Sequence, residues 1–394
     1  MVVMPAAEWR SREGLAELAA VLGHEDARFV GGAVRDTLLG LPVADIDIAT
    51  RHTPDAAVAL MKAAGVRVVP TGLAHGTVTA ITAGGPVEVT TLRRDVSTDG
   101  RHAVVAFTDD WRIDASRRDF TINALYADPA SGEVFDYFGG LDDLAAARVR
   151  FIGDPLQRIA EDHLRILRFF RFHARFGEQV DAQGLDACTD RANDLMALSR
   201  ERIAAELLKL LVARHATPTI ALMVARGILR AVLPEIDGAG VDRLATLAGA
   251  EAAYGVAPDA IRRLAALLPA DAAEAVGARL KLSNADRRRL SLATEGAGVE
   301  GPLGLAYRVG SAIAVDRLLI AGGDPSPVLA WAPPRLPIGG GALVSMGLAK
   351  GPEVARALKV IEARWIAEGF PDEARTLAIA REVTGQALGG AIIA

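Results

Sequence analysis

The sequence predicts an α+β protein, in which a small unit built around one mixed sheet is followed by an all-helical remainder. Over roughly the first 110 residues, β-branched runs bounded by glycines alternate with helical patterns. Beyond Asp154, leucine- and alanine-rich stretches at helical spacing dominate. The 394 residues, of which 51% are hydrophobic and 24% charged, suffice for about two to four domains and exclude a mainly disordered chain.

The first unit opens with an amphipathic pattern over residues 8–22, which predicts a helix. Thr53 and Pro54 provide the N-cap and the first residue of a later helix that reaches about residue 64. Glycine-bounded β-branched runs and one alternating segment predict the strands. The remaining elements are predicted as a helix at 33–39 and strands at 28–30, 45–49, 66–69, 77–82 and 87–91.

The remainder opens with Asp154 and Pro155, which predict the start of a helix that runs to about residue 175. Helical spacing of leucine and alanine predicts further helices, for example at 200–211, 217–226, 262–268 and 352–367. Residues 296–301 spell GxGxxG, but they follow a charged helical stretch and run into Pro302. A dinucleotide fingerprint needs a preceding strand and a following helix, so we expect a loop.

The composition bounds the partners and the compartment. The formal charge is 44 − 49 = −5, so any nucleic-acid surface must be a local basic patch. Cys188 is the only cysteine, which excludes an intramolecular disulfide and a cysteine-rich zinc site and fits a reducing cytosol. The first residues lack the pattern of a signal peptide, and no charge-free apolar stretch reaches the roughly 18 to 20 residues that span a bilayer. We therefore expect a soluble, cytoplasmic protein without a membrane partner.

Two acidic residues alternate with isoleucine in the segment Asp45-Ile46-Asp47-Ile48. On a strand, both carboxylates project to one side while both isoleucines enter the core. Neighbouring carboxylates repel each other unless a cation lies between them, and hard oxygen ligands suit Mg²⁺ better than zinc. Glu88 lies between two valines and is a candidate third carboxylate from another strand. Two ions about 3.5 to 4 Å apart would then hold an attacking hydroxyl and a leaving pyrophosphate.

Gly31 and Gly32 lead directly into a predicted helix. Their backbone N–H groups can approach a phosphate chain, and Arg35, one turn later, can add a bidentate phosphate contact. Each motif taken singly is more often a plain turn or a solvated strand face. Because the glycines and the aspartates lie within the segment 31–50, they together predict a phosphate and metal site.

The string GGAVRDTLLG followed by DIDIAT resembles the nucleotidyltransferase superfamily, specifically class II tRNA nucleotidyltransferases and bacterial poly(A) polymerases. Later blocks resemble, in the same order, the family's flexible loop with its second motif, its hinge motif, its nucleotide-selecting motif and the helical motif that follows. These blocks are residues 91–125, 136–144, 161–172 and 199–211. Residues 336–365 are similar more loosely to the family's C-terminal segment, with Gly341 or Ala342 where a polar or acidic residue is usual.

The resemblance implies a nucleotidyltransferase head at 1–125, a neck with the nucleotide-selecting helix at 126–190, a helical body at 191–290 and a helical tail at 291–394. It implies template-independent addition of C, C and A to tRNA 3′ ends from CTP and ATP, with release of pyrophosphate and with Mg²⁺ as the cofactor. The body and tail would hold the acceptor–T stem of the tRNA by its shape and phosphates. Neither DNA nor a membrane is an expected partner.

The resemblance also carries over site residues where the motifs match. For metal binding and catalysis they are Asp45, Asp47 and Glu88; facing the triphosphate, Gly31, Gly32 and Arg35; and holding the sugar and phosphates of the nucleotide, Arg118, Asp119 and Asn123. Asn123 offers the donor and the acceptor that a ribose 2′-hydroxyl needs. The alternative for this last block is a helix N-terminus with a buried asparagine cap.

Asp162 and Arg165 lie three residues apart on the predicted 154–175 helix and so share one face. Cytosine and adenine present an amine donor beside a ring-nitrogen acceptor, which a carboxylate and a guanidinium can pair. Uracil and guanine would place a carbonyl against the carboxylate, and a buried group left unpaired costs roughly 1 to 3 kcal/mol. We therefore hypothesise that this pair accepts CTP and ATP. The ordinary alternative is a surface ion pair.

Arginines outnumber acids around the same predicted helix, and Arg168 among them is expected to bind nucleotide. They predict a basic surface beside the triphosphate and the tRNA end, and they are Arg150, Arg158, Arg165, Arg168, Arg171 and Arg175. The four phenylalanines of the stretch are expected in the core rather than as stacking platforms; they are Phe169, Phe170, Phe172 and Phe176.

Two kinds of rival function remain open. The nearest are a poly(A) polymerase and a partial enzyme that adds only CC or only A. The loop DGRHAVVAF at 99–107 is present, whereas its deletion resembles CC-adding enzymes, and residues 66–79 show no clear match to the polymerase pattern. A rival of another class is a catalytically silent RNA-binding protein, against which the retention of Asp45, Asp47 and Glu88 argues.

Overall fold

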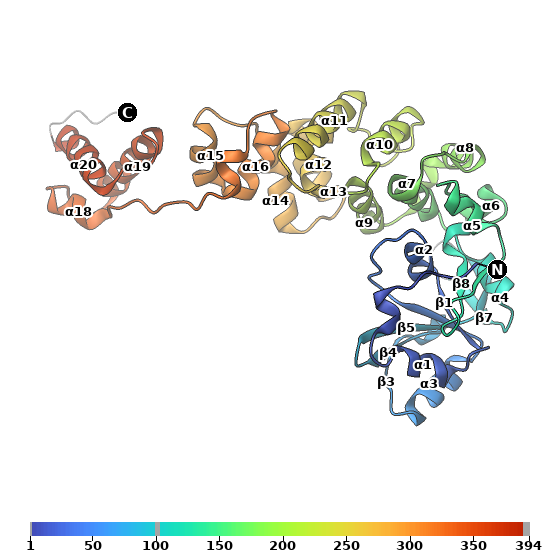
Figure 1. The fold of residues 1–394 in the computed structure, drawn as a ribbon. Helices are drawn as coiled ribbons and strands as arrows, with labels where there is room; N and C mark the ends of the chain where they lie inside the picture. Colours follow the sequence, from blue (N-terminus) through green and yellow to red (C-terminus); the bar gives the residue numbers. More distant parts are fainter. Residues whose placement is uncertain (1, 99–102, 389–394) are drawn as a thin grey trace. The chain divides into compact units, whose positions relative to one another are not determined.

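The computed structural model describes residues 2–98 and 103–388 and divides into two compact units, Met1–Pro234 and Glu235–Ala394. The first unit contains a seven-stranded sheet followed by helices, and the described part of the second unit is helical (Figure 1). The predicted α+β class is therefore confirmed. None of the helices in the described ranges is both long and apolar enough to cross a bilayer.

The first unit is ordered along the chain as helices, strands and short 3₁₀ turns (η). Its elements are η1 (Glu8–Ser11), α1 (Leu15–Leu22), β1 (Ala27–Val30), α2 (Gly32–Leu38), β2 (Asp47–Thr50), α3 (Pro54–Ala63), β3 (Arg67–Gly72), η2 (Leu73–His75), β4 (Thr77–Thr82), β5 (Gly85–Thr91), β6 (Arg93–Thr98), β7 (Ala103–Phe107), α4 (Trp111–Ser116), η3 (Thr121–Asn123), β8 (Leu125–Ala127), β9 (Val134–Asp136), α5 (Gly140–Ala145), α6 (Pro155–Glu161), α7 (Leu164–Phe176), α8 (Ala182–Asp190), η4 (Ala192–Ala197), α9 (Arg200–Leu211) and α10 (Ala216–Ala225).

The sheet has the order β3-β4-β5-β2-β1-β8-β9, in which β2 and β5 run parallel and the other neighbours antiparallel. Ile48 on β2 packs into the core cluster that contains residues of α1, α2 and α3, whereas Ala49 packs into a second cluster with Trp111 of α4. Successive residues of β2 therefore serve opposite faces of the sheet. The sheet extends through β8 and β9 to Asp136, and the division of the chain into head, neck, body and tail stays a prediction.

Two of the sequence expectations at the start of the unit have different outcomes. Thr53 caps α3, because its hydroxyl accepts from the amide of Ala56, as predicted. The single helix expected at 8–22 is wrong: it is divided into η1 and α1 by a turn at Gly14 with φ +81°. A Cβ at Gly14 would also lie 3.0 Å from the Cβ of Thr82, so the turn is fixed by backbone conformation and by close approach to β4.

The single helix predicted at 154–175 is also wrong. Asp154 caps α6 as expected, but the helix ends at Glu161, and Asp162 has extended backbone angles of φ −152° and ψ 106°. The next helix, α7, begins at Leu164, whose amide donates to the Asp162 carboxylate at 3.1 Å. The carboxylate thus competes for backbone groups that a continuous helix would pair internally.

The second unit contains two hydrophobic clusters, one that includes Leu247 and Leu319 and one that includes Leu343 and Ile361. Residues 296–301 lie mainly in a loop before a helix that begins at Gly301, and no strand of the described residues precedes them directly. The predicted loop is confirmed. The elements of this unit are α11 (Gly238–Ala253), α12 (Ala260–Leu267), η5 (Ala270–Ala272), α13 (Ala273–Arg279), α14 (Asn284–Ala293), α15 (Gly301–Val309), α16 (Ser311–Ile320), α17 (Ser326–Leu329), α18 (Gly340–Ser345), α19 (Pro352–Ala367) and α20 (Glu373–Leu388).

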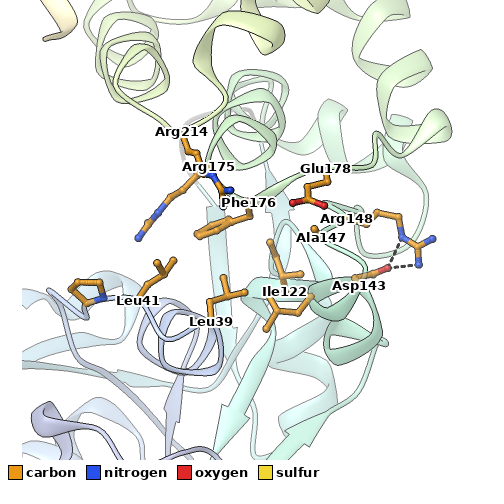
Figure 2. Close-up of a pocket in the computed structure, with 12 residues that line it drawn as sticks. Leu39, Leu41, Ile122, Asp143, Ala147, Arg148, Arg175, Phe176, Glu178 and Arg214 are labelled. Carbon is orange, nitrogen blue, oxygen red and sulfur yellow. Dashed lines mark hydrogen bonds and ion pairs between the residues drawn. The ribbon is translucent and has the colours of Figure 1, made fainter. Parts of the chain in front are cut away.

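A cavity of about 400 Å³ lies in the first unit where the C-terminal ends of α2 and α7 approach each other (Figure 2). Leu39, Leu41 and Phe176 line its apolar part, and Arg175 and Arg214 line its basic part. Among the described residues that line this cavity there is none of the three carboxylates expected to act in catalysis.

Candidate functional site

The predicted carboxylates lie where two parallel strands meet. Asp47 on β2 pairs in register with Glu88 on β5, and the amide of Glu88 donates to the carbonyl oxygen of Ile46 at 3.0 Å. Ile46 and Ile48 are buried, whereas Asp45 and Glu88 are exposed and Asp47 is half-buried. The predicted alternation is confirmed, although Asp45 lies just before β2.

The carboxylates interact electrostatically. Burial raises the pKa of Asp47 to about 6, the charges of Glu88 and Asp45 raise it as well, and the charge of Arg118 opposes them. Among the described residues, no three His, Cys, Asp or Glu side chains are gathered closely enough to hold a metal ion by themselves. Within the described residues, Asp45, Asp47 and Glu88 therefore do not form a three-carboxylate metal site by themselves.

The glycine turn lies beside these carboxylates. Gly31 precedes α2 with φ +66°, a conformation that favours glycine, and a Cβ at this position would lie 3.5 Å from Nη1 of Arg118. The charge of Arg118 also acts on Asp47. The structure thus brings together the glycine turn, one of the predicted nucleotide-binding arginines and the acidic end of β2.

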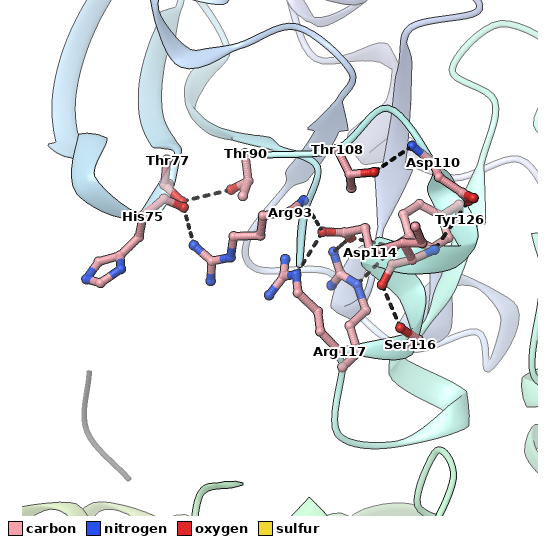
Figure 3. Close-up of polar contacts among 12 residues, drawn as sticks. His75, Thr77, Thr90, Arg93, Thr108, Asp110, Asp114, Ser116, Arg117 and Tyr126 are labelled. Carbon is pink, nitrogen blue, oxygen red and sulfur yellow. Dashed lines mark hydrogen bonds and ion pairs between the residues drawn. The ribbon is translucent and has the colours of Figure 1, made fainter. Parts of the chain in front are cut away.

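Arg118 is held by a buried carboxylate that the sequence analysis did not single out. Asp114 on α4 accepts from Nη2 of Arg118 at 3.1 Å and from the Tyr126 hydroxyl at 2.6 Å, and also from Nε of Arg117 and the amide of Arg93 (Figure 3). Burial opposes ionisation, but the charges of Arg118 and Arg117 outweigh it and hold the pKa of Asp114 below its ordinary value. The i,i+4 spacing of Asp114 and Arg118 was the available signal.

Arg35 has a different environment from the one expected. Its Nε and Nη2 reach the Asp36 carboxylate at 2.8 and 2.7 Å, and its Nη1 donates to the side-chain oxygen of Asn123. The guanidinium lies 5.1 and 4.7 Å from the ring centroids of Phe172 and Phe176. Nη2 of Arg35 would also lie 3.8 Å from a Cβ at Gly32, so the guanidinium is next to the glycine turn, and its phosphate contact stays a prediction.

Asn123 and Asp119 are likewise engaged within the protein. The Asn123 amide donates to Asp119 at 2.9 Å, and Asp119 accepts from Nε and Nη2 of Arg168 at 2.7 and 2.6 Å. These contacts use one N–H and one acceptor site of the Asn123 carboxamide, which has a further one of each, so the expected contact with a ribose hydroxyl stays a prediction. Asn123 lies within η3 rather than at a cap. Burial opposes ionisation of Asp119, but the charge of Arg168 lowers its pKa.

These contacts form one chain that joins the sheet-containing part of the unit to α7. Arg175 on α7 donates to the second oxygen of Asp36 at 3.0 Å, which closes the chain at the α2 end. We call this chain the α2–α7 junction; it runs through Arg175, Asp36, Arg35, Asn123, Asp119 and Arg168. Because the members are mostly buried and alternate in charge, the junction fixes α7 relative to the glycine turn.

The proposed selecting pair is arranged differently from the prediction. Asp162 lies in the break between α6 and α7, and both of its oxygens accept from Nη2 of Arg202 at 3.1 Å. Arg165 donates to Glu161 at 2.6 Å and to the carbonyl oxygen of Arg158 at 2.8 Å. The two residues therefore share no helix face and form no pair with each other, and each is held by separate neighbours.

The expected basic surface is largely neutralised. Each of the six arginines forms an ion pair, and the pairs are Arg150–Asp143, Arg158–Glu161, Arg165–Glu161, Arg168–Asp119, Arg171–Glu206 and Arg175–Asp36. Most of the partners come from other segments, so much of this charge is compensated within the protein, and a basic surface beside the triphosphate stays a prediction. Phe169, Phe170 and Phe172 are buried and Phe176 is half-buried, which confirms their core role.

The loop expected to be flexible is only partly described. β6 and β7 pair as an antiparallel two-stranded ribbon apart from the main sheet. The residues between them, 99–102, lie outside the described residues.

Comparisons with known proteins agree with this architecture. A model of the poly(A) polymerase head domain matches residues 27–150, and a model described as a probable RNA and SrmB-binding site of polymerase A matches residues 179–239. CCA tRNA nucleotidyltransferase 1, mitochondrial, of Mus musculus is 36% identical over 383 residues, which cover 91% of this chain and 86% of that protein. The human counterpart is 46% identical over 215 residues, so the match spans 54% of this chain and 49% of that relative's length.

Solved structures show the same likeness over the whole chain. The CCA-adding enzyme of Bacillus stearothermophilus, in complex with CTP, superimposes with a TM-score of 0.78 at 25% identity and covers 98% of this chain and 100% of that one. The CCA-adding enzyme of Thermotoga maritima, complexed with tRNA, has a TM-score of 0.72 at 20% identity, with coverage of 98% and 100%. The latter establishes a common fold.

Proposed function

The chain belongs to the family of CCA-adding tRNA nucleotidyltransferases, and we propose that it extends tRNA 3′ ends by C, C and A, using CTP and ATP and releasing pyrophosphate. The observation that carries this proposal is the register of Asp47 with Glu88 on parallel strands, beside Gly31 and Arg118. A binding protein without catalysis has no use for carboxylates that raise the pKa of Asp47, because their repulsion only costs stability.

Nucleotidyltransferases of this family use divalent metal ions, and we propose Mg²⁺ held by Asp45 and Asp47, with Glu88 as the further carboxylate. The donor set is all oxygen, which suits this ion. Burial raises the pKa of Asp47 most, and the charges of Glu88 and Asp45 add a repulsion that a cation would relieve. Mg²⁺ is commonly bound by one or two carboxylates together with substrate phosphates, which agrees with carboxylates that form no closed cage by themselves. When bound, the ion neutralises charge that develops on the reacting phosphate.

The residues around the carboxylates would position the reactants. Gly31 and Gly32 leave the backbone open to a triphosphate, and Arg118 supplies a fixed positive charge beside it. The terminal 3′-hydroxyl of the RNA attacks the α-phosphate in line, and the bond to the β-phosphate breaks as pyrophosphate leaves. Arg35, next to Gly32, is proposed to face the triphosphate, and Asn123 with Asp119 to hold the sugar and phosphates of the nucleotide. Their contacts with other protein groups would position them for this.

Base selection is proposed for Asp162 and Arg165. Arg202 orients the Asp162 carboxylate and Glu161 holds Arg165, so an acceptor and a donor are fixed before a nucleotide binds. UTP and GTP would leave a carbonyl against the carboxylate, at a cost of roughly 1 to 3 kcal/mol. Arg168, bound to Asp119, is proposed to support this site from the junction.

One assay separates this function from its rivals. The protein is incubated with tRNA that ends before CCA, after the first C or after CC, with CTP, ATP or both, and the products are sequenced. Completion to CCA without further growth is the expected result. Addition of many A residues would identify a poly(A) polymerase, addition of only CC or only A a partial enzyme, and binding without addition a silent RNA-binding protein.

We also propose a binding partner for the second unit and a cellular compartment. The helical second unit is proposed to hold the acceptor–T stem of tRNA, because A-form RNA is recognised by shape and phosphates. The free, buried Cys188 is consistent with the proposed cytoplasmic location, whereas three similar relatives carry the word mitochondrial in their names. Immunofluorescence or fractionation of the native protein tests the compartment.

A further inference from the structure

The first unit carries a basic recess apart from the carboxylates, which we call the neck recess. It consists of two adjoining cavities of about 400 Å³ each, which share Arg175 and Arg214 in their linings. Figure 2 shows the first cavity, with Leu39, Leu41 and Phe176 forming its apolar side. The second cavity is lined by four cations and two apolar residues, Arg171, Arg175, Lys209, Val212, Ala213 and Arg214.

The recess has an excess of positive charge. Lys209 and Arg214 are exposed, and within residues 2–98 and 103–388 neither forms an ion pair. No carboxylate in this part of the chain lines the second cavity. The first cavity has two, Asp143, which pairs with Arg148, and the exposed Glu178.

The elements that carry these cations are fixed to one another. Arg171 of α7 donates to Glu206 of α9 at 2.5 Å, and α9 also carries the exposed lysine. The turn after α9, which carries Arg214, is held against α7 because the amide of His215 donates to the carbonyl oxygen of Ala174 at 2.7 Å. The backbone segments that carry these cations are therefore held in place before RNA binds.

We propose that the neck recess binds phosphodiester groups of the RNA substrate, through Lys209 and Arg214 with support from Arg175. This inference rests on the proposed function, from which it takes the RNA. Several cations distributed over two adjoining cavities suit successive phosphates better than one small anion, because each neutralised phosphate releases a counterion. The recess would add affinity and orientation to the RNA without reading its sequence.

The test is the salt dependence of RNA binding by the full-length protein. A double variant, Lys209→Gln with Arg214→Gln, is compared with wild type and with a control of equal charge change, Lys62→Gln with Arg230→Gln. Lys62 and Arg230 are exposed and lie outside both cavities. Binding of tRNA lacking CCA is measured at several salt concentrations by fluorescence anisotropy.

Two lost phosphate contacts are expected to reduce the slope of log K against log salt by about 1.4 to 1.8, which corresponds to roughly 25- to 60-fold weaker binding at 0.1 M salt. The control variant is expected to bind like wild type. Equal RNA binding by the double variant and the control would overturn the proposal. So would a double variant that binds RNA like wild type and differs only in how strongly added pyrophosphate competes with RNA binding. Failure of wild type to add nucleotides, with the binding difference intact, would overturn the proposed function and not the recess.

Discussion

Replacing Asp47 by asparagine is expected to stabilise the metal-free protein at neutral pH while it abolishes nucleotide addition. Burial raises the pKa of Asp47 from the ordinary value of 3.8 to about 6, and the charges of Glu88 and Asp45 add to the shift. Between these two pH values the folded protein keeps a proton that the unfolded chain has released. The ionised carboxylate therefore costs folding free energy, and asparagine keeps the shape without the charge.

The shift from 3.8 to about 6 sets the size of the effect. One pKa unit corresponds to about 1.36 kcal/mol, so ionisation of Asp47 costs about 1.6 kcal/mol at pH 5 and about 3 kcal/mol at pH 8. The sign follows from the raised pKa: the stability that the protonated group provides is complete at low pH and is lost as the pH rises to about 6. The advantage of Asp47→Asn in free energy of unfolding should grow accordingly.

Urea unfolding in the presence of a chelator, at steps from about pH 5 to about pH 8, measures this advantage. Glu25→Gln serves as the control, because Glu25 is exposed in the turn after α1. Saturating MgCl₂ at the highest pH should narrow the gap, since a cation stabilises the charged wild-type site more than the amide variant. A variant less stable than wild type at pH 8, or an advantage that is constant with pH, would refute the reasoning.

Three further changes test the neighbouring groups. Asp162→Ala or Arg165→Ala should lower the preference for CTP over UTP in kcat/KM by about 5- to 150-fold, as expected for a lost pairing of 1 to 3 kcal/mol, and unchanged preference would remove the selection hypothesis. Arg202→Gln should lower the preference for CTP over UTP less, because this change frees the Asp162 carboxylate without removing it, and Arg202→Lys should partly restore the preference. A loss of stability with an intact preference would contradict the orienting role of Arg202. Arg168→Gln should lower the free energy of unfolding by about 3 kcal/mol at neutral pH, since it leaves buried Asp119 without its main counter-charge. Because the pairing lowers the pKa of Asp119, this deficit should shrink as the pH falls below about 4, and a deficit independent of pH would argue for lost packing instead.

Local patterns predicted the carboxylate strand well, because their outcome depends on neighbouring residues alone. The alternation around Asp47 places Ile46 and Ile48 in the core whatever the rest of the fold, and Thr53 caps a helix through its own third neighbour along the chain. Such local patterns could not predict the parallel register that places Asp47 opposite Glu88, because this register depends on how β2 and β5 pair in the sheet.

The break at Asp162 shows a limit of periodicity. Apolar residues continue at helical spacing through Ile159, Ile166 and Phe170, so the pattern predicts one helix where there are two. The available local signal was Asp162 itself, a residue type whose carboxylate readily accepts from a backbone amide two residues later. Its other partner, Arg202, lies on a different helix and could not be found from spacing.

Charge counts along the sequence fail for a related reason, because pairing is decided by neighbours in space. The arginines from 150 to 175 exceed the acids of their own stretch, yet most of their carboxylate partners come from other segments: Asp143, Asp119, Glu206 and Asp36. Arg168 and Arg175 among them fix α7 against the sheet-containing part of the unit. Lys209 and Arg214, which form no ion pair within the described residues, lie beyond the counted stretch. A binding surface for RNA phosphates is therefore better sought in cations without tertiary partners than in the segment with the most arginines.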